Sequence, residues 1–468
     1  MPQKETGRLG TEPVGRLLFR LAAPAIAAQL VNLLYNLVDR MYLGHIQPAD
    51  TVGRLALTGV GVCLPLIMIL SAFAALAGMG AAPRASIYLG QGDKESAEKT
   101  LGNAVTALVL LAVILTAVFY RFAEPMLRAF GASDGTGGSE NTLQYAFSYL
   151  RIYALGSLFV LTTLGLNTFI SAQGFTRISM CTVLIGAVCN IVLDPIFIFV
   201  LKMDAAGAAL ATILSQAVSM VWTLRFLTGK RTAIRIRLSC LKLDPAFLLP
   251  SLALGLSPFI MMSTESLLTV CFNTSLRKYG GDLAVGAMTV LSSIMQFSML
   301  PLQGLIQGAQ PIISYNFGAG HAGRVRQAFR YTLFASMTFS IALWAAVQCF
   351  PAAFVRLFND DPNLVALGSR ALRIYMAANC LFGAQIACQQ TFVALGNAKS
   401  SLFLAALRKI ILLIPLIYIL PAILPVAKTD AVFLAEPVAD VLAVATTVTL
   451  FFFQFRAAMR KLDERSPQ

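Results

Sequence analysis

Three polar segments lie in or beside long apolar runs, where polar side chains are rare. They are centred on Asp39, on the pair Asn190 and Asp194, and on Thr212. An ionisable group at the depth of a lipid bilayer costs about 3 kcal/mol or more unless it has a partner or a role. Asn190 precedes Asp194 by one helical turn on the same face, and Pro195 frees a backbone carbonyl one turn upstream. These oxygen donors predict a site for a small hard cation or a proton, with Asp39, Asn190 and Asp194 as candidate Na⁺ ligands.

The composition indicates an integral membrane protein. The chain has 468 residues, of which 57% are hydrophobic and 12% are charged, and its mean hydropathy is +0.74. A soluble domain has about 25% charged residues. Apolar runs longer than about 18 residues, continuous rather than alternating, predict membrane-spanning helices and not an outer-membrane barrel. The polar, basic first twenty residues precede an apolar run too long for the core of a signal peptide, so no separate signal peptide is expected.

The net charge of +14 would suggest a nucleic-acid partner in a soluble protein. Here most Lys and Arg residues fall in segments on the same side of the membrane as the N-terminus. The positive-inside rule therefore predicts that both termini are cytoplasmic, and it leaves no reason to expect nucleic acid as a partner. The eight cysteines lie mostly in apolar runs without a C-x-x-C pair, which indicates free thiols and not disulfides or a metal site.

Hydropathy predicts twelve spanning helices in two lobes. The helices are expected at about residues 17–43, 54–81, 99–122, 145–171, 177–201, 206–228, 246–278, 284–312, 327–350, 364–394, 400–424 and 430–456. The densest basic stretch suggests a cytoplasmic linker at 229–245 between an N-lobe at 17–228 and a C-lobe at 246–456. Cytoplasmic tails are expected at 1–16 and 457–468.

Sequence motifs of the first half recur in the second half. The segment Gly80-Ala-Ala-Pro with its following Gly90-x-Gly92 recurs as Gly308-Ala-Gln-Pro with Gly318-x-Gly320, and Leu150-Arg-Ile-Tyr recurs as Leu372-Arg-Ile-Tyr. Two halves with six helices each have the same orientation in the membrane. We therefore predict an all-α polytopic membrane protein whose twelve transmembrane helices form two six-helix bundles related by a pseudo-twofold axis, with a cleft between them and a rocking motion.

The order and spacing of these motifs resemble the multidrug and toxic compound extrusion (MATE) family, within a larger group that includes lipid-linked oligosaccharide flippases. The resemblance covers about residues 15–457. It is carried by Val38-Asp39-x-x-x-x-Gly44, Leu89-Gly-Gln-Gly92, Ala172-Gln-Gly174 and Asn190-x-x-Leu-Asp-Pro195. The segments Gln310 to Gly318 and Leu395 to Lys399 resemble the MepA-like bacterial multidrug exporters.

The resemblance implies a function and a site. It implies an antiporter that is not an enzyme and that exports organic, often cationic, amphiphiles and drugs in exchange for H⁺ or Na⁺. It also implies a multi-pass protein of the bacterial inner membrane that works as a monomer without a cofactor. The family's cation site in the N-lobe maps onto Asp39, Asn167, Asn190, Asp194 and Thr212. The residues suit H⁺ and Na⁺ equally, so both ions stay open.

The C-lobe matches the family only in part. Glu265 lies where a family carboxylate is expected, but the matching region of the tenth helix has only Gln385, Gln389 and Gln390, which favours coupling in the N-lobe. Because no Lys or Arg is close to Glu265 in its own run, we expect this carboxylate to be unpaired in the cleft, where it binds a cationic drug or carries a proton.

Other candidate residues complete the predicted transport path. The substrate cavity is predicted to contain Glu265, Gln303, Gln307, Met288 and Met295, because unbranched methionines adapt to varied ligands. Pro24 is a candidate hinge of the first helix. We assign no role to Arg408 and Lys409, whose long side chains can snorkel toward the membrane surface.

Alternative functions are less consistent with the sequence. A flippase of the same superfamily is the main alternative, but a polyanionic lipid headgroup requires several basic residues inside the helices. A transport ATPase lacks its Walker motif here, and a channel lacks a filter-like loop. An enzyme is disfavoured because the only two histidines, His45 and His321, lie in predicted loops.

Overall fold

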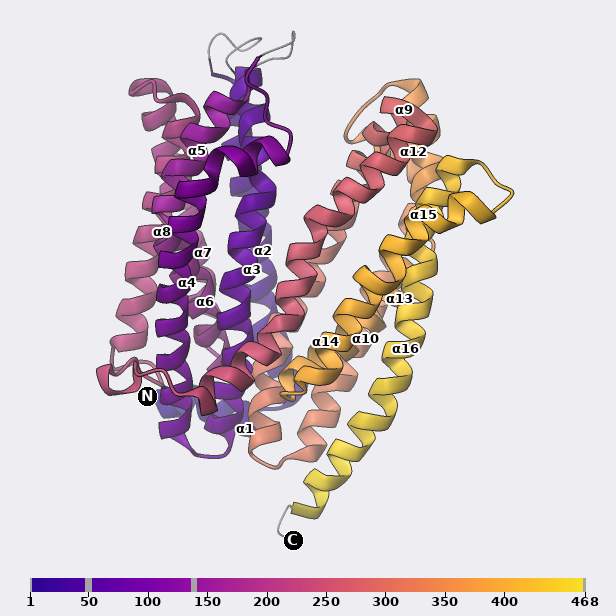
Figure 1. Ribbon diagram of the computed structural model, residues 1–468. Helices are drawn as coiled ribbons and strands as arrows, with labels where there is room; N and C mark the ends of the chain where they lie inside the picture. Colours follow the sequence, from indigo (N-terminus) through magenta and orange to yellow (C-terminus); the bar gives the residue numbers. More distant parts are fainter. Residues whose placement is uncertain (1, 47–52, 136–140, 466–468) are drawn as a thin grey trace. The chain divides into compact units, whose positions relative to one another are not determined.

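The computed structural model describes residues 2–46, 53–135 and 141–465 (Figure 1). These residues form helices joined by short turns and contain no β-strand. The first half consists of α1 (Pro2–Thr11), α2 (Val14–Gly44), α3 (Arg54–Gly90), α4 (Lys94–Ala129), α5 (Leu143–Leu155), α6 (Ser157–Ala172), α7 (Thr176–Pro195), the π-helical η3 (Ile196–Val200), α8 (Asp204–Thr228) and the short η4 (Leu238–Cys240). The second half consists of α9 (Pro245–Gly318), α10 (Ala322–Cys349), α11 (Pro351–Arg356), α12 (Pro362–Tyr375), α13 (Asn379–Ala394), α14 (Ala398–Ala406), the π-helical η5 (Leu407–Leu413), α15 (Ile414–Ile423) and α16 (Lys428–Arg465).

Twelve membrane spans can be counted in the described residues. Nine helices are long and apolar enough to cross a membrane, and two bent pairs, α5 with α6 (58°) and α12 with α13 (46°), add two more. Helix α9 has 74 residues and would be about 110 Å long if straight, against a hydrocarbon core of about 30 Å. It breaks at Gly281, where a φ of +64° suits glycine, and therefore forms two spans. This arrangement agrees with the predicted all-helical fold.

The predicted helix ends are less accurate than the predicted helices. The third helix was expected at 99–122 and extends over Lys94–Ala129. It begins early because the Asp93 side chain accepts a hydrogen bond from the Ser96 backbone N–H at 3.0 Å and caps the first turn. The predicted N-terminal tail at 1–16 contains the additional helix α1.

Contacts divide the chain into two compact units. Unit 1 consists of Met1–Arg8, Ala27–Leu89 and Asp93–Gly255, and unit 2 consists of Leu9–Ile26, Gly90–Gly92 and Leu256–Gln468. These units differ from the predicted lobes in several places, since Gly90–Gly92 also belong to unit 2 and residues 246–255 of the predicted C-lobe belong to unit 1. The first part of α2 packs with unit 2, and the predicted linker 229–245 packs with unit 1.

Small residues explain why the first part of α2 belongs to unit 2. Gly304 and Gly308 lie one turn apart on α9. A Cβ atom on Gly304 would lie 2.5 Å from Cα of Ile26, and one on Gly308 would lie 2.5 Å from Cα of Ala22. The two backbones can approach this closely only because the glycines have no side chain, as in small-xxx-small helix packing.

The repeated glycine of the first half has the corresponding place in unit 1. A Cβ atom on Gly80 of α3 would lie 2.1 Å from the Ser251 carbonyl oxygen, and one on Gly255 would lie 1.8 Å from the Leu76 carbonyl oxygen. Gly80 and Gly308 head the two copies of the same motif. Each therefore packs its helix against the beginning of a long helix. The repeated sequence motif thus has the same structural role in both halves.

Glycines with positive φ occur at matching places of the two halves. Gly92 and Gly320 have φ values of +80° and +79°, and Gly174 and Gly396 have values of +89° and +75°. Each follows the end of a helix, where a left-handed residue stops the helix and glycine adopts this conformation without a steric penalty.

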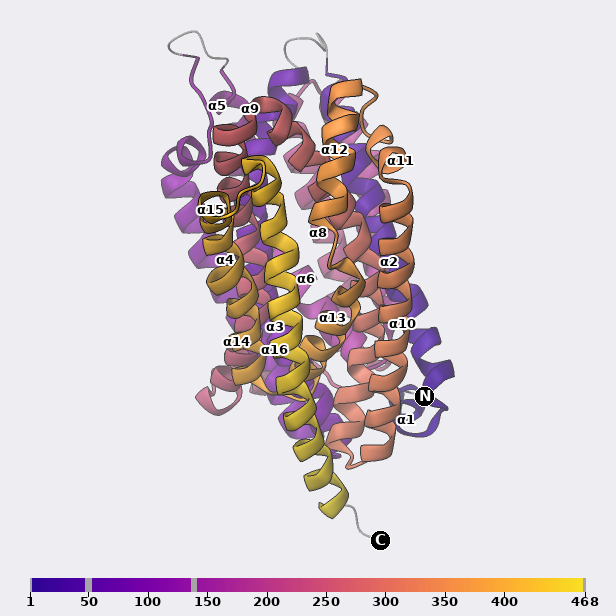
Figure 2. The same cartoon turned by 90° about the vertical axis from the view of Figure 1, so that its right-hand side faces the viewer.

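Each unit has its own apolar core. Phe119 and Phe169 are among the largest fully buried side chains of unit 1, in which α8 packs against α5, α6 and α7. In unit 2, α13 packs against both α10 and α16 (Figure 2). Rings of Phe329, Phe392 and Phe451 join these three helices, with centroids 4.5 and 5.2 Å apart.

A buried glutamine anchors the segment after α8 to unit 1. Gln173 is fully buried, and its Oε1 accepts hydrogen bonds from the Thr232 hydroxyl (2.8 Å) and from the backbone N–H groups of Ala233 (2.8 Å) and Ile234 (3.1 Å). Its Nε2 donates to the Phe169 carbonyl at 3.0 Å. One side chain therefore satisfies two backbone donors, and lies within hydrogen-bonding distance of the Thr232 hydroxyl, in a segment that the sequence suggested only as a basic linker.

A second anchor is the buried carboxylate of Glu98 on α4. It accepts a hydrogen bond from the backbone N–H of Arg235 at 3.3 Å and forms an ion pair with Arg237 at 2.7 Å. Further along α4, Asn103 Oδ1 accepts from the backbone N–H of Asp244 at 2.7 Å. The segment is thus held along its length by α4 and by the end of α6.

We expect Gln173→Leu to destabilise this segment, because the backbone N–H groups of Ala233 and Ile234 lose their acceptor at a cost of about 2 kcal/mol or more. The detergent-solubilised protein should unfold at a lower temperature, and trypsin should cleave faster at Arg231 and Arg235. The exposed Gln91→Leu variant is the control and should behave like the wild type. Unchanged cleavage in Gln173→Leu would show that the segment is held by other contacts.

Candidate functional site

Four of the five predicted N-lobe residues come together in unit 1. Asp39 on α2 and Asp194 on α7 are close enough for direct hydrogen bonding between their carboxyl groups. Asn190 Nδ2 lies 3.2 Å from Asp194 Oδ1 and 3.4 Å from Thr212 Oγ1 on α8. The cluster therefore joins α2, α7 and α8 through two acids, an amide and a hydroxyl.

Several oxygen atoms of this cluster are buried without a hydrogen-bond partner in the protein. They are Oδ1 of Asp39, Oδ1 of Asn190 and Oδ2 of Asp194. Asp194 is fully buried and Asn190 is 2% exposed. Buried acceptors without donors cost free energy unless a bound proton, water or cation satisfies them. The donor set of carboxylate, amide and hydroxyl oxygens fits a proton or a hard cation such as Na⁺.

Local sequence explains this geometry. Asn190 and Asp194 are one turn apart, so their side chains lie on one face of α7. Pro195 ends α7, and the π-helical η3 follows directly. The Thr212 hydroxyl donates to the Ala208 carbonyl of its own helix at 2.9 Å, which leaves its oxygen as the acceptor for Asn190.

The structure does not bring Asn167 into this cluster. Its Nδ2 donates to the Ser179 carbonyl at 3.4 Å, near the beginning of α7. Ser179 precedes Asn190 by three helical turns, which correspond to about 16 Å along the axis. The resemblance matched the residue type in the right span, but helical position decides which part of α7 an asparagine on α6 can reach.

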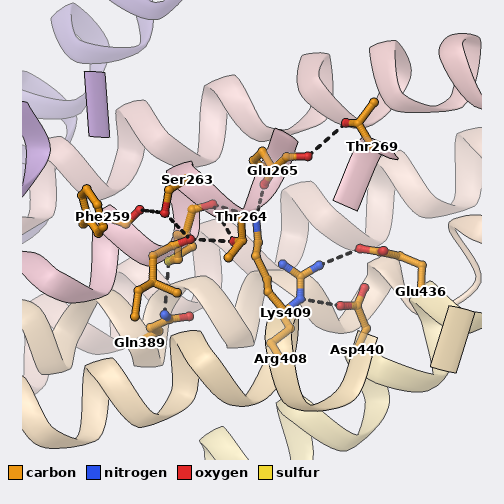
Figure 3. A network of polar contacts seen from close by, with 12 residues as sticks. Phe259, Ser263, Thr264, Glu265, Thr269, Gln389, Arg408, Lys409, Glu436 and Asp440 are labelled. Carbon is orange, nitrogen blue, oxygen red and sulfur yellow. Dashed lines mark hydrogen bonds and ion pairs between the residues drawn. The ribbon is translucent and has the colours of Figure 1, made fainter. Parts of the chain in front are cut away.

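The expectation that Glu265 is unpaired is wrong. The Lys409 ammonium of η5 forms an ion pair with the Glu265 carboxylate (Figure 3). It also donates to the Met261 carbonyl at 3.0 Å. Lys409 is 144 residues away along the chain. The search for basic residues near Glu265 in its own run therefore missed it.

Arg408 is the second buried base to which the sequence assigned no role. Its guanidinium donates to Asp440 Oδ1 at 2.7 Å and to Glu436 Oε1 at 2.9 Å, both on α16 (Figure 3). It also lies over the ring of Phe382, 4.7 Å from the centroid. The spacing of Glu436 and Asp440, one turn apart in an apolar run, was the sequence signal that could have revealed this partnership.

The other predicted cavity residues have different environments. Met288 is 5% exposed and belongs to the apolar core of unit 2, so it packs between helices and does not line an open cavity. Met295 packs against the same core and is partly buried. Gln303 is exposed and Gln307 is partly buried, one turn apart on α9. Their roles in substrate binding stay predictions.

Comparison with known proteins identifies the family. The model of the family described as MatE matches residues 24–196 and 258–419, which is more than half of the chain. The chain belongs to the MATE family. Its predicted family and fold class are thereby confirmed, and it is a multi-pass membrane transporter.

The relatives agree along nearly the whole chain. The multidrug export protein MepA of Staphylococcus haemolyticus is 24% identical over 429 residues, covering 90% of this chain and 92% of the relative. The solved MATE multidrug transporter DinF-BH is 33% identical, with a TM-score of 0.87 and 98% of each chain covered. A MATE protein solved in the bent conformation is 22% identical, with a TM-score of 0.90 over 99% of this chain and all of that one.

We expect Arg408→Met to destabilise the fold strongly, because it leaves two buried carboxyl groups without their partner, at about 3 kcal/mol or more. Thermal unfolding of the purified protein measures the effect. Arg460→Met is the control, since Arg460 pairs with Glu464 on the surface with its side chain 83% exposed and surface pairs contribute about 0–1 kcal/mol. Equal melting temperatures for the two variants would contradict a structural role of the Arg408 pairs.

Proposed function

We propose that this MATE protein is a secondary active exporter that exchanges organic, often cationic, amphiphiles for H⁺ or Na⁺. The observation that carries the proposal is the contact between Asp39 and Asp194, with buried oxygens that have no partner in the protein. The similarity to MepA, a multidrug export protein, and to DinF-BH, a multidrug transporter that was solved with a bound ligand, supports the class of cargo.

The acidic pair provides the coupling step. Two carboxylates in contact repel one another in a medium of low dielectric constant, so a proton or a cation binds there favourably. Loading the site removes the repulsion between α2 and α7, and unloading restores it. An ion gradient can drive transport through this site only if the ion binds the outward and inward states with different affinities.

Helix α2 transmits this change. Its residues up to Ile26 pack with unit 2, whereas the part from Ala27 onward, which carries Asp39, packs with unit 1. Pro24 lies two residues before this division and interrupts the backbone hydrogen bonding of the helix. A change at Asp39 therefore acts on a helix that lacks a backbone hydrogen bond close to the place where its packing partner changes.

The remaining parts of the proposal concern location and partners. The protein functions in the bacterial inner membrane with both termini in the cytoplasm, as a monomer, and without a cofactor. Met295, Gln303 and Gln307 contribute to the path of the cargo. A flippase is not favoured, because Arg408 and Lys409 are each paired with carboxylates and are not free to bind a polyanionic headgroup.

We expect Asp39→Asn and Asp194→Asn to abolish ethidium efflux driven by an imposed pH or Na⁺ gradient in vesicles, because the neutral amide cannot release and rebind a proton. Binding of ethidium to the purified protein should persist. The control is Asp282→Asn, since the Asp282 side chain is 88% exposed in a surface ion pair. Normal gradient-driven efflux by either test variant would exclude that residue from coupling.

We expect Pro24→Ala to slow efflux several-fold while leaving ethidium affinity nearly unchanged, since alanine restores the backbone hydrogen bond and stiffens α2. Efflux rates and binding constants measured on the same preparation separate these effects. Pro125→Ala, near the end of α4, controls for a general effect of removing a helical proline. A Pro24→Ala variant with unchanged transport rate would rule out a hinge at this residue.

A further inference from the structure

Lys409 is a buried ammonium group that forms an ion pair with an accessible carboxylate. The Lys409 side chain is 4% exposed, whereas the side chain of Glu265 is 56% exposed. Lys409 also donates to the Met261 carbonyl at 3.0 Å, one turn before Glu265 on the same helix. A solute that reaches Glu265 therefore contacts a carboxylate that is already paired with a buried positive charge.

The neighbouring base has the opposite arrangement. Both acids that bind Arg408 are buried, with the side chains of Glu436 8% and Asp440 5% exposed. The two carboxylates outnumber the one guanidinium, and Glu436 also interacts electrostatically with Lys409, but both acids are buried and out of reach of a solute. Both bases lie on the π-helical η5. Because consecutive residues of a helix point in different directions, Arg408 faces α16 and Lys409 faces α9.

We propose that Lys409, a positive charge that belongs to the chain and neutralises Glu265, determines how unit 2 discriminates between cationic and neutral cargo at Glu265. This inference rests on the proposed function and extends it to the class of cargo. A compact, permanent cation at Glu265 must share the carboxylate with the Lys409 ammonium or displace it, and two like charges near one carboxylate repel. A neutral amphiphile does not meet this repulsion. The site therefore favours neutral and charge-delocalised amphiphiles over compact quaternary cations.

The contacts of Lys409 also show which substitution tests this proposal without leaving a buried acid unpaired. Lys409→Met retains an unbranched stem of similar size and removes the charge. The Glu265 side chain that remains is 56% exposed, so the substitution leaves no enclosed carboxylate behind and the variant should fold. Removing Arg408 instead would leave buried acids behind, which makes it unsuitable.

The experiment compares two probes on purified, full-length protein. We expect Lys409→Met to bind tetraethylammonium, a compact permanent cation, about tenfold more tightly than the wild type, because one repulsive charge is gone. Binding of the neutral dye Nile red should not change. Lys399→Met, which removes an exposed lysine near the beginning of α14, should match the wild type with both probes.

A double variant makes the test specific to the ion pair. In Glu265→Gln/Lys409→Met the gain for tetraethylammonium should disappear, so that the double variant binds like Glu265→Gln alone. The inference is overturned if the gain persists without Glu265, if both probes change equally, or if Lys409→Met does not change cation binding. Should Lys409→Met fail to fold, Glu265→Gln must still weaken binding of the cation and not of Nile red.

The inference and the proposed function fail in different measurements. Absence of gradient-driven efflux by the wild type in vesicles refutes the transport proposal. The difference between Lys409→Met and wild type in equilibrium binding needs no gradient and no transport, so it tests the role of Lys409 by itself.

Discussion

Charge in an apolar environment is the constraint on which this structure depends. An ionised side chain inside a membrane protein requires a partner, because the surrounding lipid and side chains cannot solvate it. The two units meet this requirement differently. In unit 1, Asp39 contacts another acid, Asp194. In unit 2, Glu265 contacts a base, Lys409.

The difference has functional consequences. An acid–acid contact is incomplete and needs a mobile charge from outside, either a proton or a cation. An acid–base contact is complete, and its positive charge is covalently attached to the chain. The proposed function therefore assigns the loading and release of an ion to unit 1, and the proposed role of Lys409 assigns a fixed charge that acts on cargo to unit 2. This division agrees with the sequence of α13, which has Gln385 and Gln389 where a carboxylate could stand.

Backbone packing determines which helices can respond. Gly304 and Gly308 let the beginning of α2 approach α9 closely, and Gly80 and Gly255 bring α3 and α9 together in the same way. Such contacts leave little space for relative sliding, so the proposed movement requires a place where a helix changes its packing partner. For α2 that change falls next to Pro24.

The amino-acid sequence by itself determined the helical fold, the repeat of its two halves and the pairing of Asn190 with Asp194. These features depend on hydropathy, on glycines at helix ends and on residues one turn apart, all of which are local. It also indicated Asp39 and Thr212, because the family pattern fixes them in order along the chain.

Only the tertiary structure decided the partners of buried charges. Lys409 and Glu265 are separated by 144 residues, and no local pattern shows which helices face each other or at what height. The same reason separates Asn167 from the acidic cluster. The helix that carries Asn167 was predicted correctly, but the part of α7 that its side chain contacts depends on how α6 and α7 pack. Long-range packing, and not residue type, thus decides which polar groups meet inside the membrane.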